Sequence, residues 1–106
     1  MAATPKVLAR TTLSNTGSFP VATVPTGKRW VLTNLIITHS GSINAASVYV
    51  WVSLNGTPLV AWYVLAPGSV FTLDCAQVLE SGNQLQAWSD SVGLVAINAS
   101  GVEMDL

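Results

Sequence analysis

The chain has 106 residues, of which half are hydrophobic and only 8% are charged, and its formal net charge at pH 7 is −1. Because an ordinary soluble domain is roughly 25% charged, this length and composition predict a single domain with an uncharged surface that is buried in an assembly. Four basic residues are too few to follow a phosphate backbone, and a single cysteine excludes an intramolecular disulfide and a thiolate metal cluster.

The N-terminal part is predicted to hold an arm and two strands. Residues 1–5 are small and polar, which is typical of a flexible arm, and residues 6–106 are assigned to the domain. The arm and the residues after it lack the apolar run of a secretory signal. Lys6 to Leu13 is predicted to be a strand that ends at a turn over residues 14–17. Phe19 to Val24 is a second strand, placed at a sheet edge by Pro20 because proline cannot donate to a central ladder.

The longest strand candidate runs from Arg29 to His39 and is rich in β-branched residues, so we expect a central strand there. No Asp, Glu, Lys or Arg occurs between Trp30 and Leu73. Prolines and glycines nevertheless interrupt this stretch well before the roughly 20 apolar residues that a membrane-spanning helix needs. The sequence therefore argues against a transmembrane segment.

A hairpin is predicted from Ser47 to Leu65, around Asn55-Gly56, the dipeptide that best tolerates the two positive φ angles of a type I′ turn. Counting outward from Leu54 and Thr57 predicts an aliphatic face with the pairs Val52–Leu59, Val50–Ala61 and Val48–Tyr63. The opposite face then holds the pairs Trp51–Val60 and Tyr49–Trp62. Both faces are apolar, so something other than solvent must cover the aromatic one.

Three further strands are predicted at Ser69–Cys75, Leu85–Trp88 and Leu94–Val102, with Phe71, Leu73 and Cys75 on the buried side of the first. About eight short strands separated by turn signals, with no convincing helix, are typical of a sandwich or a small barrel. We therefore predict an all-β fold, a single-domain, antiparallel, jelly-roll-like β-sandwich.

The aromatic face of the hairpin has three possible roles: core packing, a protein interface, or stacking against sugars. Aromatic residues are enriched in protein interfaces, where Lys and Glu are depleted, as they are here. Sugar platforms usually add carboxylates and amides, and the hairpin offers only Asn55 at its tip. The candidate interface residues are Tyr49, Trp51, Val60 and Trp62.

The sequence contains few residues that could serve as a general base or an activated nucleophile. His39 ends a strand and Cys75 lies on the apolar side of another, and these are the only histidine and the only cysteine. No Gly-x-Ser-x-Gly elbow, zinc spacing, calcium loop or phosphate-binding loop is present. We predict no catalytic residue, no metal site and no cofactor, and neither a nucleic acid nor a membrane as partner.

Six motifs follow one another over about residues 20–103: Val-Pro-x-Gly-Lys at 24–28, a long strand with Asn34, Ser-Leu-Asn-Gly at 53–56, a Pro-Gly turn at 67–68, Val-Leu-Glu-x-Gly-Asn at 78–83, and Ser-Gly-Val-Glu at 100–103. Their order resembles that of small all-β structural proteins of phage virions. Proteins of this kind are capsid decoration, head-fibre, neck or tail components.

This resemblance implies a non-enzymatic capsid decoration or cement protein that binds the capsid exterior and stabilises the particle. Its partners would be further copies of itself, with a trimer expected by analogy, and the major capsid protein or another virion protein. It would be assembled in the host cytoplasm and located in the virion. Lys6 and Arg10 are the candidate shell-facing residues. The alternatives are a tail, neck or fibre component, or a carbohydrate-binding module for host attachment.

Overall fold

The computed structural model describes residues 3–13, 19–91 and 93–106, and these contain eight β-strands. In chain order they are β1 (Ala3–Thr12), β2 (Phe19–Thr23), β3 (Lys28–His39), β4 (Val48–Leu54), β5 (Thr57–Leu65), β6 (Val70–Leu79), β7 (Gln84–Ser89) and β8 (Val95–Asp105). Across this part of the chain, no helix is long and apolar enough to cross a membrane.

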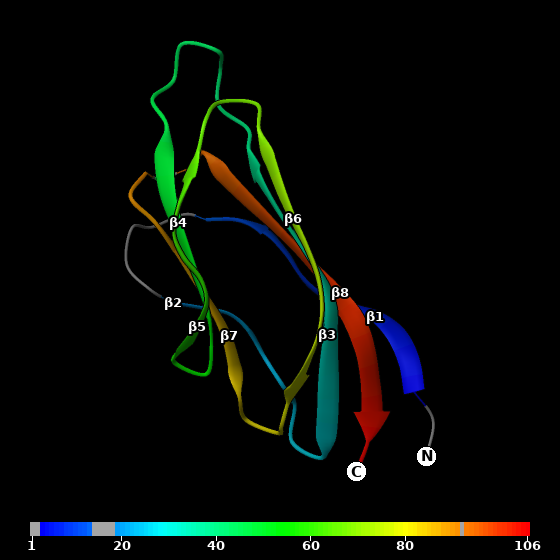
Figure 1. Ribbon diagram of the computed structural model, residues 1–106. Coiled ribbons are helices and arrows are strands. Elements are labelled where there is room, and N and C mark those ends of the chain that lie inside the picture. Colours follow the sequence, from blue (N-terminus) through cyan, green and yellow to red (C-terminus); the bar gives the residue numbers. More distant parts are fainter. Residues whose placement is uncertain (1–2, 14–18, 92) are drawn as a thin grey trace.

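The strands form two four-stranded antiparallel sheets that face each other as a sandwich (Figure 1). The order in one sheet is β1-β8-β3-β6 and in the other β2-β7-β4-β5. Each strand of the first half therefore pairs with its counterpart counted from the end, β1 with β8, β2 with β7, β3 with β6 and β4 with β5. This winding is that of a jelly roll, and the predicted fold class is confirmed.

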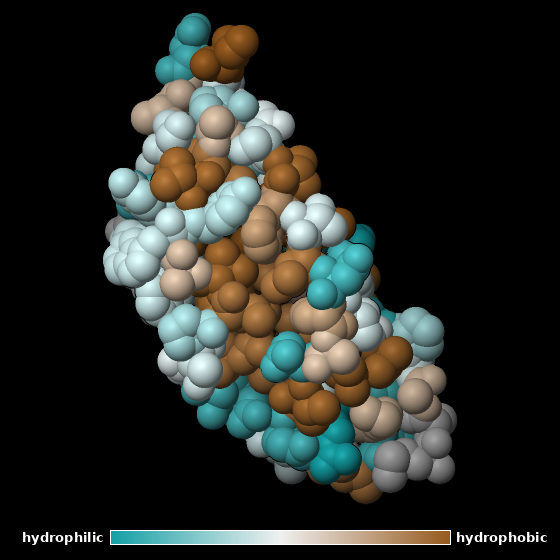
Figure 2. All heavy atoms as spheres, in the orientation of Figure 1, coloured by the Kyte–Doolittle hydropathy of each residue, from teal (hydrophilic) through white to brown (hydrophobic). Residues whose placement is uncertain are grey.

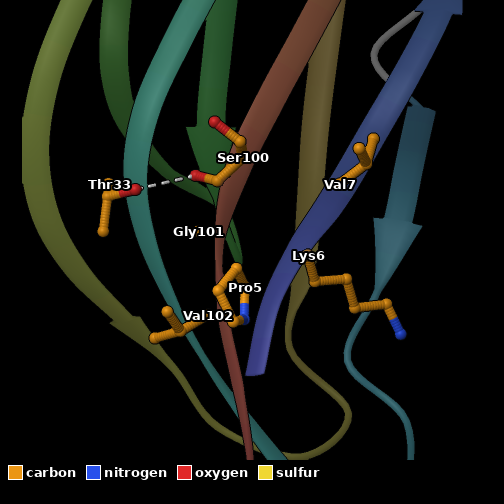
Figure 3. Close-up of a pocket in the computed structure, with 7 residues that line it drawn as sticks. All are labelled: Pro5, Lys6, Val7, Thr33, Ser100, Gly101 and Val102. Atoms are coloured by element: carbon orange, nitrogen blue, oxygen red, sulfur yellow. Dashed lines mark hydrogen bonds between the residues drawn. The ribbon is translucent and has the colours of Figure 1, made fainter. Parts of the chain in front are cut away.

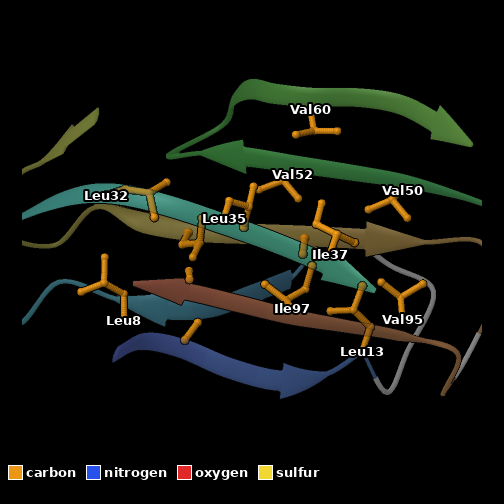
Figure 4. Packing of buried hydrophobic residues seen from close by; sticks show 14 of the residues in the cluster. Leu8, Leu13, Leu32, Leu35, Ile37, Val50, Val52, Val60, Val95 and Ile97 are labelled. Carbon is orange, nitrogen blue, oxygen red and sulfur yellow. The ribbon is translucent and has the colours of Figure 1, made fainter. Parts of the chain in front are cut away.

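The core fills the space between the sheets. Strand alternation directs one set of side chains inward, and the largest contributions come from β3, β4 and β8 (Figure 4). The buried residues of these three strands include Leu32, Leu35, Ile37, Val48, Val50, Val52, Val95, Ile97 and Ala99. As predicted, β3 is central, and β2 lies at an edge.

Gly101 marks a close approach of two backbones in the first sheet. It lies in β8 between β1 and β3, and a Cβ added to it would sit 1.9 Å from the carbonyl oxygen of Val31. No side chain fits there, so β8 can lie against its neighbours at this point only with glycine.

The predicted turns and strand limits agree with the structure in most places. Asn55 and Gly56 have φ values of 49° and 88°, as a type I′ turn requires. The predicted N-terminal arm is shorter than expected, because residues 3–5 belong to β1 and pair with residues 102–104 of β8. The remainder of the arm, residues 1–2, and the turn predicted at residues 14–17 lie outside the described residues.

Candidate functional site

Four aromatic side chains form a cluster on the outer face of the β2-β7-β4-β5 sheet, which we call the aromatic face: Tyr49, Trp51, Trp62 and Trp88. Trp62 is at its centre, and its ring meets the others edge to face. The centroid of the Trp62 ring lies 6.4 Å from that of Tyr49, 5.2 Å from that of Trp51 and 5.5 Å from that of Trp88. Such contacts contribute about 0.5–1.5 kcal/mol per pair beyond the area they bury, so the cluster holds its own shape.

The cluster is open to solvent at Trp62 and Tyr49. Their exposed fractions are 61% and 48%, whereas Trp51 and Trp88 are half-buried. Contiguous exposed apolar patches mark interaction sites on soluble proteins, so the exposed part of this aromatic cluster is the feature that needs an explanation.

The backbone at Trp62 is in the left-handed region, with φ at 52°. A β-bulge causes this, since two residues of β5, Ala61 and Trp62, lie opposite Trp51 alone. Bulges re-aim side chains, and a left-handed backbone is unfavourable for a bulky residue. The chain thus accepts local strain at the most exposed residue of the aromatic face.

The predicted register of the hairpin is wrong beyond Ser53. The structure pairs Val52 with Val60 and Val50 with Tyr63, because one bulge at Leu59 and a second at Ala61-Trp62 each insert a residue in β5. Each inserted residue moves the following side chains to the other face. Val60 is therefore 6% exposed in the core and is not part of the interface that its sequence position predicted.

Trp88 was not among the predicted interface residues. It lies directly opposite Trp51 because β4 pairs with β7 on the side away from β5. The local signal was present, since Leu85 and Ala87 alternate with Gln86 and Trp88 along β7. What the sequence lacks is any local sign that β7 is the neighbour of β4.

The polar groups beside the aromatic face are bonded to one another. Gln86 Oε1 accepts from Ser53 Oγ at 2.9 Å and from the Gly56 amide at 2.8 Å, and Gln86 Nε2 donates to Gln84 Oε1 at 3.3 Å. At the hairpin tip, Asn55 Oδ1 accepts from the Gln84 amide at 3.4 Å. These amides support the hairpin and are not arranged around an open ligand position.

Lys6 and Arg10, the predicted shell-facing residues, lie on β1 in the other sheet. Lys6 Nζ lies 2.9 Å from Glu103 Oε2 and 5.9 Å from the centre of the Trp30 ring. Arg10 Nε donates to Asn98 Oδ1 at 3.0 Å. Lys6 thus has partners within the fold, whereas the Arg10 guanidinium is fixed at one nitrogen on an exposed strand. The two candidate surfaces are on different sheets and cannot form one site.

Glu103 accepts a second hydrogen bond, from the indole Nε1 of the buried Trp30 at 2.8 Å. This bond, together with the one from Lys6, holds the pKa of the Glu103 carboxyl below its ordinary value. The arrangement ties β1, β3 and β8 together at one end of the sandwich and has the character of a structural ion pair.

His39 and Cys75 each have a structural partner and not a catalytic one. His39 is fully buried, and its Nε2 lies 2.9 Å from the Ala46 carbonyl oxygen while its Nδ1 accepts from the Gly41 amide at 3.1 Å. Cys75 Sγ lies 3.5 Å from the Leu32 carbonyl oxygen, and burial together with the charge of Asp74 raises the pKa of the thiol. Within residues 3–13, 19–91 and 93–106, no three His, Cys, Asp or Glu side chains gather as metal ligands would.

A shallow hollow of about 520 Å³ lies on the outer face of the other sheet, above Gly101 (Figure 3). It is lined mainly by Pro5, Lys6, Val7, Ser100 and Val102, with Thr33 at its rim donating to the Ser100 carbonyl oxygen at 3.3 Å. It is open and mostly apolar, and we find no group there that is arranged to hold a small molecule.

The edge of the sandwich between β5 and β6 is apolar and incompletely closed. Figure 2 shows hydrophobic side chains gathered in the middle of the face where these two strands lie in Figure 1. Leu59, Phe71, Leu73 and Cys75 pack against the core from this edge but remain partly exposed. The rings of Tyr63 and Phe71, 4.6 Å apart between centroids, bridge the two strands.

Comparison with known proteins gives a weak structural likeness. No family model matches the chain, and no curated protein matches it. The chain is similar to a solved pentameric capsid protein from metagenomic phage sequences, with a TM-score of 0.36 and 18% sequence identity. The match covers 93% of this chain and 61% of that one, so this chain spans less than two thirds of its neighbour. A TM-score this low leaves the function to be argued from the residues.

Proposed function

We propose that this protein is a non-enzymatic structural protein of a phage virion, a capsid decoration protein that binds the capsid exterior through its aromatic face. The observation that carries this proposal is the exposed Trp62, held in a left-handed bulge at the centre of four aromatic rings. The phage setting comes from the order of sequence motifs, and the mode of action comes from the aromatic face.

A protein surface suits the aromatic face better than a sugar does. A sugar needs hydrogen-bond partners beside the ring, and the Gln86, Ser53 and Asn55 side chains are already bonded within the hairpin and its neighbour β7. Exposed Trp and Tyr with few charges nearby are the composition of the centre of a protein interface.

The energy available is modest for one copy and large for a shell. The exposed parts of Trp62 and Tyr49, at 61% and 48% of each residue, together amount to roughly 250 Å², and burying them is worth about 6 kcal/mol before the costs of association. A micromolar contact needs about 8 kcal/mol, so further area must be buried around the rings. Repeated over many copies, such contacts would resist internal pressure without any chemical step.

Of the two predicted shell-facing residues, Arg10 is the better candidate for a contact with the shell. Arg10 lies on β1, in the sheet opposite the aromatic face, and there it is available to bind a shell protein. Lys6 can bind a shell protein only if its ion pair with Glu103 breaks. We expect the protein to form homo-oligomers, a trimer by analogy with other capsid ornaments, and to join the major capsid protein in particles assembled in the host cytoplasm.

The test is Trp62→Glu, with Val78→Glu as its matched control. Val78 is 56% exposed on β6 of the other sheet, so both variants place a new carboxylate on an exposed apolar position. We expect Trp62→Glu to remain folded by circular dichroism and to lose co-sedimentation with particles that lack the protein, while Val78→Glu still binds. Equal binding of both variants would contradict the proposal.

Two alternatives have distinct signatures in the same material. A tail, neck or fibre component would use the same aromatic face but would label one vertex or the tail in electron micrographs, not the whole shell. A carbohydrate-binding module for host attachment is favoured by the exposure of Trp62. In that case host glycans would quench the tryptophan fluorescence of the wild type, and Trp62→Glu would abolish the quenching.

A further inference from the structure

The two sheets end in four edge strands, β1, β6, β2 and β5, and three of these are protected against pairing with another chain. Proline, lysine, short length and bulges are the usual protective devices. β1 carries Pro5, Lys6 and a bulge at Leu8, and β2 is only five residues long with Pro20. β5 carries Pro58 and the two bulges described above.

β6 is the edge strand with the least protection. It has ten residues without proline, glycine, lysine or arginine, and Asp74 is its one charged residue. A single bulge at Cys75-Ala76 interrupts it. Before that bulge, Val70 to Asp74 pair without interruption with Thr38 to Asn34 of β3, so their backbone is regular and their other edge is open.

The side chains of Val70 to Asp74 are incompletely buried, just as the backbone of this segment lacks a partner strand on one side. Phe71 and Leu73 point inward at the incompletely closed edge between β5 and β6 and are only partly buried. Thr72 lies on the outer face and is exposed. The segment therefore offers the unpaired backbone groups of an edge strand, and its inner apolar side chains stay partly exposed although the Tyr63 ring contacts Phe71.

We propose that Val70 to Asp74 pairs antiparallel with the same segment of a second copy, about a two-fold axis at Thr72. Opposed residues of an antiparallel pair share a face, so an axis at Thr72 matches inner positions with inner and outer with outer. Phe71 of each copy then lies opposite Leu73 of the other on the inner face. The two Thr72 side chains meet on the outer face, a favourable cross-strand pair.

Charge favours a second copy in this register. The only charges brought in are the two Asp74 side chains, each placed opposite an uncharged Val70. They are four residues apart along the paired strands, about 14 Å, which exceeds the screening length of about 8 Å at physiological salt. If the pairing of the two β6 strands shifted by one residue, Phe71 and Leu73 of one copy would lie opposite outer-face residues of the other. The inner-face side chains therefore specify this register.

This two-fold contact joins the β1-β8-β3-β6 sheets of two copies into one continuous sheet. It lies on the sheet opposite the aromatic face and does not depend on the proposed function. The two-fold contact can therefore form whatever the number of copies that associate through the aromatic face. A mutation in the aromatic face should leave the β6 contact intact, and a mutation in β6 should leave the aromatic face intact.

The first test is Thr72→Lys, with Thr12→Lys as its matched control. Thr12 is exposed on β1, the other edge strand of the same sheet. Lysine at 72 places two like charges opposite each other on the axis, so we expect the mass in solution by light scattering to fall to half that of the wild type. Thr12→Lys and Trp62→Glu should keep the two-fold contact at Thr72. An unchanged mass for folded Thr72→Lys would overturn the proposal.

The second test is positive and uses the absence of any other cysteine. In a Cys75→Ser background, Thr72→Cys places two thiols across the axis, at a cross-strand spacing that a disulfide can span. Mild oxidation should yield a covalent dimer, while Thr12→Cys in the same background should not. No dimer from Thr72→Cys, or equal yields from both variants, would overturn the proposal even if Thr72→Lys failed to fold.

Discussion

Glycine should be better than alanine at position 62 and worse at position 49, although both positions lie on the same aromatic face. Trp62 has a φ of 52°, and Tyr49 is not among the residues with positive φ. Replacing either aromatic side chain removes ring contacts, but that loss is nearly the same for glycine and alanine at a given position. The comparison within each pair therefore isolates the backbone.

The size of the effect follows from the conformations. An L-residue in the left-handed region costs about 1–2 kcal/mol that glycine does not, whereas glycine in an ordinary strand costs about 0.5–1 kcal/mol relative to alanine. We expect Trp62→Gly to be more stable than Trp62→Ala by about 1 kcal/mol. At Tyr49 the order reverses, so the two pairs differ by about 1.5–2 kcal/mol in total.

Thermal and urea unfolding of the four variants measure this difference. For a domain of this size, 1 kcal/mol corresponds to about 4–8 °C in Tm, which is well resolved. If Trp62→Ala is at least as stable as Trp62→Gly, the bulge imposes no strain on the side chain at position 62. The strain could then no longer support a functional role for Trp62.

Two further predictions concern the other sheet. Gly101→Ala should unfold the protein or lower its stability by about 3 kcal/mol or more, since the new Cβ would lie 1.9 Å from the Val31 carbonyl oxygen in the middle of a sheet; urea unfolding checks this. Because the Glu103 pKa is held below its ordinary value by Trp30, its stabilising contribution is present at pH values above the ordinary glutamate pKa of 4.5 and is lost as the pH falls through the lowered value. Glu103→Gln should therefore lower the Tm at neutral pH and flatten its decrease in acid, and a wild-type acid slope in that variant would contradict the assignment.

The fold was predictable because its signals are local. Asn55-Gly56 specifies one hairpin, proline marks an edge strand, and the β-branched run from Arg29 to His39 specifies a long strand. These local signals do not specify which strands pair across long sequence separations, so the orders β1-β8-β3-β6 and β2-β7-β4-β5 come from the structure.

The composition of the aromatic face was only partly predictable. Tyr49 and Trp51 follow from alternation near the turn, but Val60 lies in the core because the bulge at Leu59 shifts β5 by one residue. Trp62 keeps its predicted face only because the second bulge, at Ala61-Trp62, shifts the strand again. Bulges depend on how the bulged strand fits its neighbours, so counting residues from a turn cannot locate them. Trp88 joins the cluster through the pairing of β7 with β4, a contact between strands far apart in the sequence.

The distribution of charge connects the fold to assembly. The basic residues lie in the first thirty positions and the acidic ones beyond residue 73, and the sequence left open whether they meet within one fold or between copies. The antiparallel order β1-β8-β3-β6 brings these regions together, and Lys6 pairs with Glu103, Lys28 with Asp105, and Arg29 with Glu80.

Because these pairs neutralise one another, little charge is left to repel an approaching copy. The acidic residues nearest the two proposed contacts accept hydrogen bonds from neutral donors: Asp90 from the Tyr49 amide and Asp74 from the Asn34 side chain. A protein that lived alone in solution would gain from unpaired surface charge. Here the aromatic face and the β6 edge are nearly uncharged, which lowers the electrostatic and desolvation cost of bringing a protein surface against them.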